Sequence, residues 1–438
     1  MTIPKRTMML RSILTVALAL TLAACSSEPE DRGTSATIIE CGALIDGISS
    51  QPRYNQVITI VDERITLVDA GPTSASNVID LSDYTCMPGL IDTHSHMVED
   101  YGDINDLSVY FTRKSTKQQE IATVLAARTL DAGFTTIRNL AAYDGFADVA
   151  LRNRINNGEI LGPRMQASGY YLTIPGGGGD LLIPDYDESS IPARVRMGIA
   201  QGPEEFRRKA QGAIAGGADV LKIIASGAVL AFGGVPGAPE MTPAEIEAVV
   251  EVAHAANLKV TAHAHSAQSI KEAILAGVDS IEHASLADDE AIALALEHDV
   301  AFSMDIYNGT FIATVGREEG WSEEFLRKND ETTEAQRQVF TRAHAAGVPI
   351  IYGTDAGVFP HGDNGRMFAY QVEHGMTPME ALQSATSVAA TYIGWAHDVG
   401  SIEPDRFGDI IAVRGNPLDD ISLLEHPEVV IKGGQRIK

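Results

Sequence analysis

The segment LIDTHSH ends a hydrophobic run with two histidines, His94 and His96, one residue apart. Because alternate side chains of a β-strand point to the same face, these two imidazoles would project together while Ser95 faces away. Two imidazoles on one face suit a divalent metal ion. Many His-x-His pairs bind nothing, so a metal site requires further ligands elsewhere in the chain.

Further candidate ligands follow in later apolar runs. They are Lys222 in LKIIASG, His263 and His265 in KVTAHAH, His283 in SIEHAS and Asp355 in YGTDAG. Each has an ordinary structural explanation, because a strand histidine can be a satisfied core residue, an aspartate can cap a helix and Lys222 can pair with a buried acid. A bare ammonium in an apolar run is nevertheless costly. The recurrence of these residues at strand ends predicts one shared metal site.

The elements that would position these residues alternate along the chain. Short apolar runs are each followed by a helical stretch, and the runs lie at 90–96, 134–140, 163–169, 220–226, 259–265, 280–285, 301–307 and 349–355. One helical stretch has Thr242 as its N-cap and Pro243 at its first position. Eight strands that alternate with helices predict an α/β fold, a (β/α)8 barrel with catalytic residues at the carboxyl ends of its strands. A doubly wound sheet is the alternative, but no G-x-G-x-x-G turn follows a first strand.

Short strands separated by turn residues flank this pattern at both ends of the chain. We expect residues 37–88 and 400–438 to form one small β-sandwich domain, and residues 89–399 to form the barrel. Two glycine-rich loops, at 175–179 and 227–238, follow the third and fourth barrel strands. Loops in that position overhang the catalytic face, so they are predicted to cover the site as lids.

The N-terminus carries a targeting segment that is excluded from the fold. Basic residues precede an apolar run that is too short for an ordinary membrane span. The following LAAC resembles the lipobox of bacterial lipoproteins, which implies a signal peptide over residues 1–25, lipidation of Cys25 and a tether over residues 26–36. Ser26 then favours sorting to the outer membrane, so the protein is expected in the bacterial periplasm as a lipid-anchored enzyme. The alternative is a plain secretory signal cut near Ala24.

Charge and cysteine content restrict the partners and the redox setting. The chain has 59 Asp and Glu against 33 Lys and Arg, which argues against nucleic acid or an anionic lipid surface as a partner. Membrane contact is expected only through the N-terminal lipid. Cys41 and Cys86 remain after Cys25, and two such cysteines can pair in an oxidising periplasm, although their spacing cannot prove it.

Several segments, in order, resemble the amidohydrolase superfamily over nearly all of the mature chain. They are PGLIDTHSH, LKIIASG, AHAHS, GVDSIEHAS and GTDAG, followed by the closing GSIEPDRFGDIIAV. Within the superfamily the chain is most similar to the group of imidazolonepropionase-like proteins, Xaa-Pro dipeptidases and zinc-dependent arginine or lysine carboxypeptidases. The ochratoxin amidohydrolases resemble the same group. The stretches SMDIYNGTFI and RKNDETTEAQR are closest to the carboxypeptidases.

Carried over residue by residue, the resemblance implies two divalent metal ions, for which zinc is expected. One ion would be held by His94, His96 and Asp355, the second by His263 and His283, and a carboxylated Lys222 would bridge both. A carbamate is anionic and offers oxygen ligands, which removes the problem of a buried ammonium. Asp355 would act first as general base and then as general acid toward the leaving amine.

The substrate contacts that we expect are His265, Tyr307, His361 and Tyr170. His265 would bind the substrate or its tetrahedral oxyanion, and it is therefore counted with Asp355 as catalytic. The chain departs from its relatives at two positions. It has PGGGG where several relatives carry a histidine, and it has Met241 where relatives often carry an aromatic residue. Contacts to a C-terminal carboxylate must therefore differ from those of the relatives.

The resulting hypothesis is a binuclear metal-dependent hydrolase that releases the C-terminal amino acid from dipeptides or N-acyl amino acids. The alternative is an imidazolonepropionase-like enzyme or a xenobiotic amidase of the ochratoxin type. A non-catalytic binding lipoprotein is a third possibility, but ligand binding alone requires neither Lys222 nor Asp355. The expected partner is a small peptide-like molecule, and the enzyme is expected to be a homo-oligomer.

Overall fold

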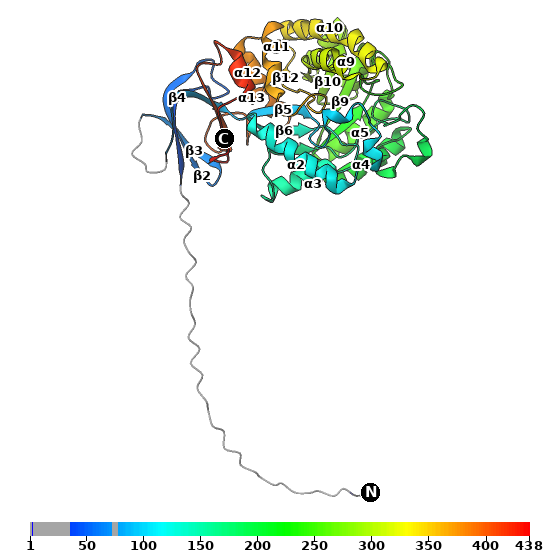
Figure 1. Ribbon diagram of the computed structural model, residues 1–438, viewed down its shortest axis with the longest axis horizontal. Coiled ribbons are helices and arrows are strands. Elements are labelled where there is room, and N and C mark those ends of the chain that lie inside the picture. Colours follow the sequence, from blue (N-terminus) through cyan, green and yellow to red (C-terminus); the bar gives the residue numbers. More distant parts are fainter. Residues whose placement is uncertain (1, 3–35, 72–77) are drawn as a thin grey trace. The chain divides into compact units, whose positions relative to one another are not determined.

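The computed structural model describes residue 2 and residues 36–71 and 78–438, and Ala36–Lys438 forms one compact unit (Figure 1). The predicted signal peptide, Cys25 and the tether up to residue 35 lie outside the described residues, so lipidation and outer-membrane sorting stay predictions. Among the described residues, no helix has both the length and the apolar character that crossing a membrane requires.

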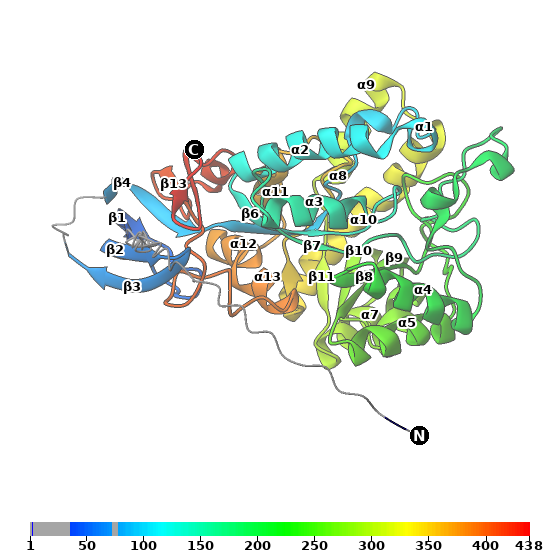
Figure 2. The same cartoon turned by 90° about the horizontal axis from the view of Figure 1, so that it is seen from below.

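Strands from both ends of the chain form one seven-stranded sheet (Figure 2). In spatial order they are β15 (Gln435–Arg436), β14 (Val429–Lys432), β13 (Ile410–Arg414), β4 (Val78–Pro88), β1 (Thr37–Leu44), β2 (Arg53–Val61) and β3 (Arg64–Ala70). On β2, Ile58 and Ile60 are buried while their strand neighbours are partly exposed. This alternation gives the sheet one apolar face that packs into a core of its own.

The predicted β-sandwich is wrong in one respect, because the strands form a single continuous sheet instead of two facing sheets. The physical reason is the length of β4, which pairs with β1 through Val78–Leu81 and Thr85–Cys86 and, on its other edge, with β13 through Tyr84–Pro88. One long strand therefore joins the N-terminal and C-terminal strands edge to edge. The domain boundaries after residue 88 and before residue 400 stay a prediction.

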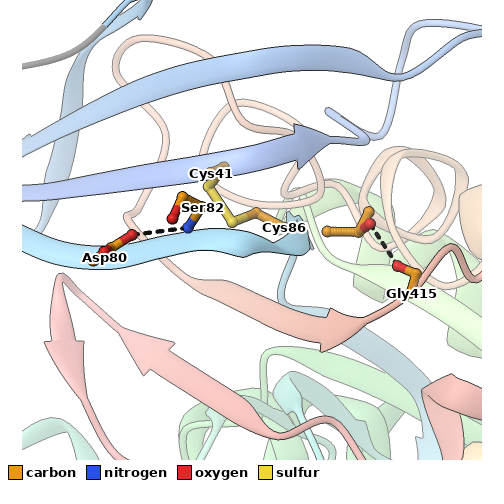
Figure 3. The surroundings of a disulfide bond; sticks show 6 residues. Cys41, Asp80, Ser82, Cys86 and Gly415 are labelled. Atoms are coloured by element: carbon orange, nitrogen blue, oxygen red, sulfur yellow. Dashed lines mark hydrogen bonds between the residues drawn. A yellow bond between two sulfur atoms is a disulfide. The ribbon is translucent and has the colours of Figure 1, made fainter.

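A disulfide between Cys41 and Cys86 links the neighbouring strands β1 and β4, with the two Cα atoms 6.0 Å apart (Figure 3). The register of the two strands shifts at Gly42, between Cys41 and Ala43. A Cβ on Gly42 would collide with the carbonyl oxygen of Ser82, so glycine is required where β4 approaches. The bridge thus fastens an irregular strand pair beside the junction with β13.

Eight parallel strands in the described residues form a three-stranded and a five-stranded sheet. The first holds β5 (Leu90–Ser95), β6 (Phe134–Asn139) and β7 (Arg164–Ala167), and the second holds β8 (Val220–Ile224), β9 (Lys259–Ser266), β10 (Ser280–Leu286), β11 (Ala301–Ser303) and β12 (Ile350–Ile351). Single bridges connect the two sheets, from Leu172 to Ile223 and from Ser95 to Ala356. This is a TIM-barrel-like α/β fold, and the eight strands coincide with the eight predicted runs.

Helices follow the strands in the predicted alternation. They include α2 (Ser115–Asp131), α3 (Ala147–Asn156), α4 (Pro203–Ala215), α5 (Pro243–Ala255), α6 (Ala267–Leu275), α7 (Asp289–Glu297), α10 (Glu323–Ala346), α11 (Met367–Glu373), α12 (Pro378–Ser384) and α13 (Ser387–Tyr392), with the short α1 (Val109–Thr112), α8 (Asn308–Phe311) and α9 (Arg317–Glu319). The predicted start of α5 is confirmed, because Thr242 and Glu245 form a reciprocal capping box. Ser266 caps α6 directly after β9, which fixes the chain beside His265.

We predict that the disulfide contributes to stability, because it closes a loop of 45 residues in the unfolded chain. Replacing both Cys41 and Cys86 by serine should lower the free energy of unfolding by about 2–4 kcal/mol. Denaturant unfolding followed by circular dichroism measures this difference. Thiol counting on the unfolded, unreduced protein provides the control, and free thiols on both Cys41 and Cys86 would refute the bridge.

Candidate metal centre

Four histidines and one aspartate converge at the carboxyl ends of the barrel strands. His94 and His96 end β5, His263 and His283 lie on β9 and β10, and Asp355 follows β12. All five are at most 9% exposed. Nε2 of His94 and Nε2 of His96 lie 3.2 and 2.9 Å from Oδ1 of Asp355. The His283 ring is 5.0 Å from that of His94 and 4.5 Å from that of His263, measured between centroids.

Two of these residues have a strained backbone conformation that directs their side chains toward the other ligands. His283 and Asp355 have positive φ angles of 70° and 60°, which non-glycine residues rarely adopt. On β10, the side chain of Glu282 already points into the barrel interior, so the next residue of a regular strand would point outward. The register shift that begins at His283 redirects its ring toward His94 instead. Such strain at a cluster of ligands is typical of a functional site.

The surroundings of Lys222 indicate whether the residues of the cluster fit a metal centre. It lies in the middle of β8, only 1% exposed, and its Nζ has no hydrogen-bond partner among the described residues. Burial lowers the pKa of this amine to about 8. An ammonium enclosed without partners is unfavourable, whereas an oxygen-bearing carboxylated amine beside histidines would complete a metal ligand set. The residues therefore fit divalent ions.

The groups that could hold an ion include one ligand beyond the predicted set. Suitable ligand atoms lie within 4.8 Å of one another in two groups, one of His94, His283 and Asp355 and the other of His263, His265 and His283. His265 therefore joins the second group, although we predicted for it only a role toward substrate. The division of ligands between two ions stays a prediction.

Burial keeps most of these imidazoles in the neutral form that binds metals. It lowers the pKa of His94 to about 4 and that of His265 to about 3, and it holds the pKa of His263 well below the usual range. His96 and His283 differ, because burial lowers their pKa values but the adjacent carboxylates of Asp355 and Asp305, respectively, raise them above the usual value. At neutral pH the imidazoles of His94, His263 and His265 are therefore unprotonated and can bind metal cations.

Buried carboxylates behind the histidines orient their rings, and the sequence analysis missed them. Oε2 of Glu282 lies 3.0 Å from Nδ1 of His94, while its Oε1 pairs with Arg138 at 2.7 Å. Oδ1 of Asp305 accepts from Nδ1 of His283 at 2.9 Å and from Gln336 at 2.7 Å. These contacts leave the Nε2 atoms facing the centre. A charged residue inside an apolar strand, as in SIEHAS and AFSMDIY, was the available signal.

The structure places the four predicted substrate contacts in different surroundings. His265 lines the cavity over the cluster, and its Nδ1 lies 2.8 Å from Ser285 Oγ. Tyr170 points into the core, where its hydroxyl donates to the Lys209 carbonyl. His361 lies behind the ligands and donates to the backbone oxygen of His96. Tyr307 packs among Phe311, Phe359 and Tyr370. None of these last three side chains lines the cavity, and their contact with substrate stays a prediction.

The cavity walls come from the loops that the sequence placed over the site. Gly178 of the first glycine-rich loop and Ala228, Val229 and Leu230 of the second line the cavity. The backbone N–H of Gly178 donates to Glu240 at 2.8 Å, which ties the first loop to the end of the second. Tyr171 lies where Tyr170 was predicted, with its hydroxyl 3.1 Å from Nδ1 of His96. Adjacent side chains point to opposite sides in this segment, so Tyr171 lines the cavity and Tyr170 does not.

Comparison with known proteins agrees with this geometry. Residues 85–437 match the amidohydrolase family, and the chain therefore belongs to that family. Ochratoxinase from Aspergillus niger is 32% identical over 434 residues, covering 92% of this chain and 86% of that protein. Imidazolonepropionase from Geobacillus kaustophilus is 25% identical over 406 residues, covering 85% and 86%. The protein is thus a hydrolase that acts on amide bonds.

A solved structure supports the same assignment. The crystal structure of a Xaa-Pro dipeptidase with bound methionine in its active site superimposes with a TM-score of 0.84 at 36% sequence identity. The match covers 92% of this chain and all of the other. The reported relatives therefore include an ochratoxinase, an imidazolonepropionase and a Xaa-Pro dipeptidase, three of the four kinds of enzyme that the sequence resembles.

We predict that Asp305→Asn weakens metal binding, because it removes the charge that holds Nδ1 of His283. Retention of divalent ions should fall about 10- to 100-fold, as for other residues that orient ligands. Metal content after dialysis against a weak chelator measures the effect. Asp330→Asn on the exposed side of α10 is the matched control. Equal retention in all three proteins would contradict the role of Asp305.

Proposed function

We propose that the protein is a binuclear metal-dependent hydrolase that releases the C-terminal amino acid from dipeptides or N-acyl amino acids. The observation that carries the proposal is Lys222, whose buried Nζ has no partner among the described residues although it lies in a cavity lined by His94, His263 and His283. A carboxylated Lys222 would bridge the two ligand groups. Zinc is the proposed metal, since it accepts mixed nitrogen and oxygen ligands.

The side chains around the cluster have distinct roles in this proposal. Bound ions would supply an activated water and polarise the amide carbonyl. Asp355 directs Oδ1 to His94 and His96, while its Oδ2 accepts from Asn308 at 3.1 Å. This arrangement leaves Asp355 placed to take a proton and pass it to the departing nitrogen. His265, fixed by Ser285, faces the same cavity and would hold the carbonyl side of the substrate.

A second candidate function is supported by the aromatic wall of the cavity. Tyr110, Tyr143 and Tyr171 lie side by side, with ring centroids 5.2 and 5.1 Å apart between neighbours. Such a wall suits a flat aromatic acyl group, as an amidase of the ochratoxin type would require. Hydrolysis of an N-aroyl amino acid in preference to all dipeptides would favour this second function.

Assembly and location are proposals that rest on the sequence. The two parallel sheets are proposed to act as one closed (β/α)8 barrel, joined at the bridges beside Leu172 and Ser95. The enzyme is proposed to be a homo-oligomer, lipid-anchored through Cys25 at the periplasmic side of the outer membrane. Neither proposal affects the chemistry of the site.

Lys222→Ala should lower metal content and abolish turnover together. The purified wild type should hold about two divalent ions per chain, and removal of the bridging group should release at least one. Elemental analysis with parallel activity measurement tests this. Short carboxylic acids should partly restore activity, because their oxygens can replace those of the carbamate. A Lys222→Ala protein with two ions and normal activity would show that the bridge is assigned wrongly.

Release of the C-terminal residue predicts recognition of its carboxylate. An N-acyl amino acid should be cleaved with higher kcat/KM than its C-terminal amide. His265 would take the part that a loop histidine plays in relatives, because the N–H of Gly178, the residue of the first glycine-rich loop that lines the cavity, already donates to Glu240. Equal kcat/KM for the acid and the amide would remove C-terminal release from the proposed function while leaving amide hydrolysis intact.

A further inference from the structure

The charged lining of the cavity is predominantly acidic. Its carboxylates are Glu99, Asp100, Asp305 and Asp355, and Lys222 is the single lysine or arginine among the described lining residues. Asp355 and Asp305 are engaged with the histidines and with Asn308. Asp100 caps a short helical turn by accepting from the Gly102 N–H at 3.0 Å. Glu99 remains as the carboxylate whose function the mechanism does not explain.

Glu99 keeps accepting capacity on the cavity side. Its Oε1 accepts from the Tyr143 backbone N–H at 3.1 Å, and its Oε2 lies 3.4 Å from the Tyr171 hydroxyl and 3.7 Å from Nδ1 of His96. An ionised carboxylate can accept about four hydrogen bonds. The side chain is 12% exposed and belongs to the cavity lining. It can therefore take another donor from a molecule in the cavity.

The position of Glu99 matches one particular group of a peptide substrate. A single imidazole, that of His96, separates Oε2 of Glu99 from Oδ1 of Asp355. In a dipeptide the α-nitrogen of the first residue lies about 2.5 Å from the scissile carbonyl carbon. A charge-assisted hydrogen bond adds about 2.8 Å. Glu99 therefore lies beside the ligand cluster with one ring between them, and the α-ammonium group is the charged group of a dipeptide that adjoins its scissile carbonyl.

Three tyrosines beside Glu99 add further groups that can bind an ammonium group. Tyr171 and Tyr143 flank Glu99, and Tyr110 follows Tyr143 in the wall. Electron-rich aromatic faces attract ammonium groups, and next to a carboxylate they suit a cation more than a neutral amide. Ile104, Leu107 and Leu230 line the cavity as well, so the adjoining space is apolar.

We infer that Glu99, against the wall of Tyr110, Tyr143 and Tyr171, binds the free α-ammonium group of a dipeptide whose first side chain is apolar. The inference rests on the proposed amide hydrolysis and chooses between the two substrate classes left open there. Dipeptides with a free amine are the substrates, and blocking the amine converts them into poor ones. Glu99 is a specificity-determining residue, in addition to its contact with His96.

The test compares leucyl-alanine with N-acetyl-leucyl-alanine in the wild type, Glu99→Gln and Asp100→Asn. The wild type should prefer the free dipeptide about 10- to 100-fold in kcat/KM, the range of one hydrogen bond to a charged group. Glu99→Gln should lose most of this preference by slowing the dipeptide alone. Asp100→Asn should keep the wild-type ratio. Calorimetric titration with leucine and with N-acetyl-leucine should give the same ordering in binding.

Two results would overturn the inference. One is an equal loss for both peptides in Glu99→Gln, because this would assign Glu99 only to the positioning of His96. The other is a wild type that cleaves or binds the acetylated compound as well as the free one. If the metal-loaded wild type cleaves neither peptide, the proposed function fails separately, and the comparison of leucine with N-acetyl-leucine still decides whether Glu99 recognises an amine.

Discussion

The structure is organised around a buried lysine nitrogen whose ammonium form is disfavoured by burial. Lys222 is enclosed by the barrel strands and finds no hydrogen-bond donor or acceptor among the described residues. Burying such a charge without partners costs several kcal/mol. In the proposed function the amine is carboxylated and shares cations with the surrounding imidazoles and Asp355. The strained backbone at His283 and Asp355 and the buried carboxylates of Glu282 and Asp305 hold these ligand side chains close to one another.

Much of this arrangement could be predicted from sequence. Strand periodicity placed His94 and His96 on one face, and the eight apolar runs predicted the alternation of strands and helices that the structure shows. Thr242 and Pro243 marked the beginning of α5 correctly because capping depends on a few adjacent residues. These features are local, so a short window of sequence determines them. The ligand cluster could be predicted because strand ends in a barrel meet on one side.

The remaining features depend on contacts between distant segments. Glu282 and Asp305 orient the histidines through partners such as Arg138 and Gln336, and no spacing rule connects these positions. Tyr170 was predicted where Tyr171 lies, because the irregular chain after β7 has no fixed period from which to assign a face. The single sheet in place of a sandwich likewise depends on the pairing of β4 with β1 on one edge and with β13 on the other.

The bridging role of a carboxylated Lys222 is the central claim, and labelling of the carbamate tests it most directly. The apoprotein would be reconstituted with divalent ions in ¹³C-labelled bicarbonate and examined by ¹³C NMR, with Lys222→Ala as the matched control. The account predicts one labelled carbamate per chain in the wild type and none in the variant. A wild type that holds two ions per chain without incorporating label would contradict it.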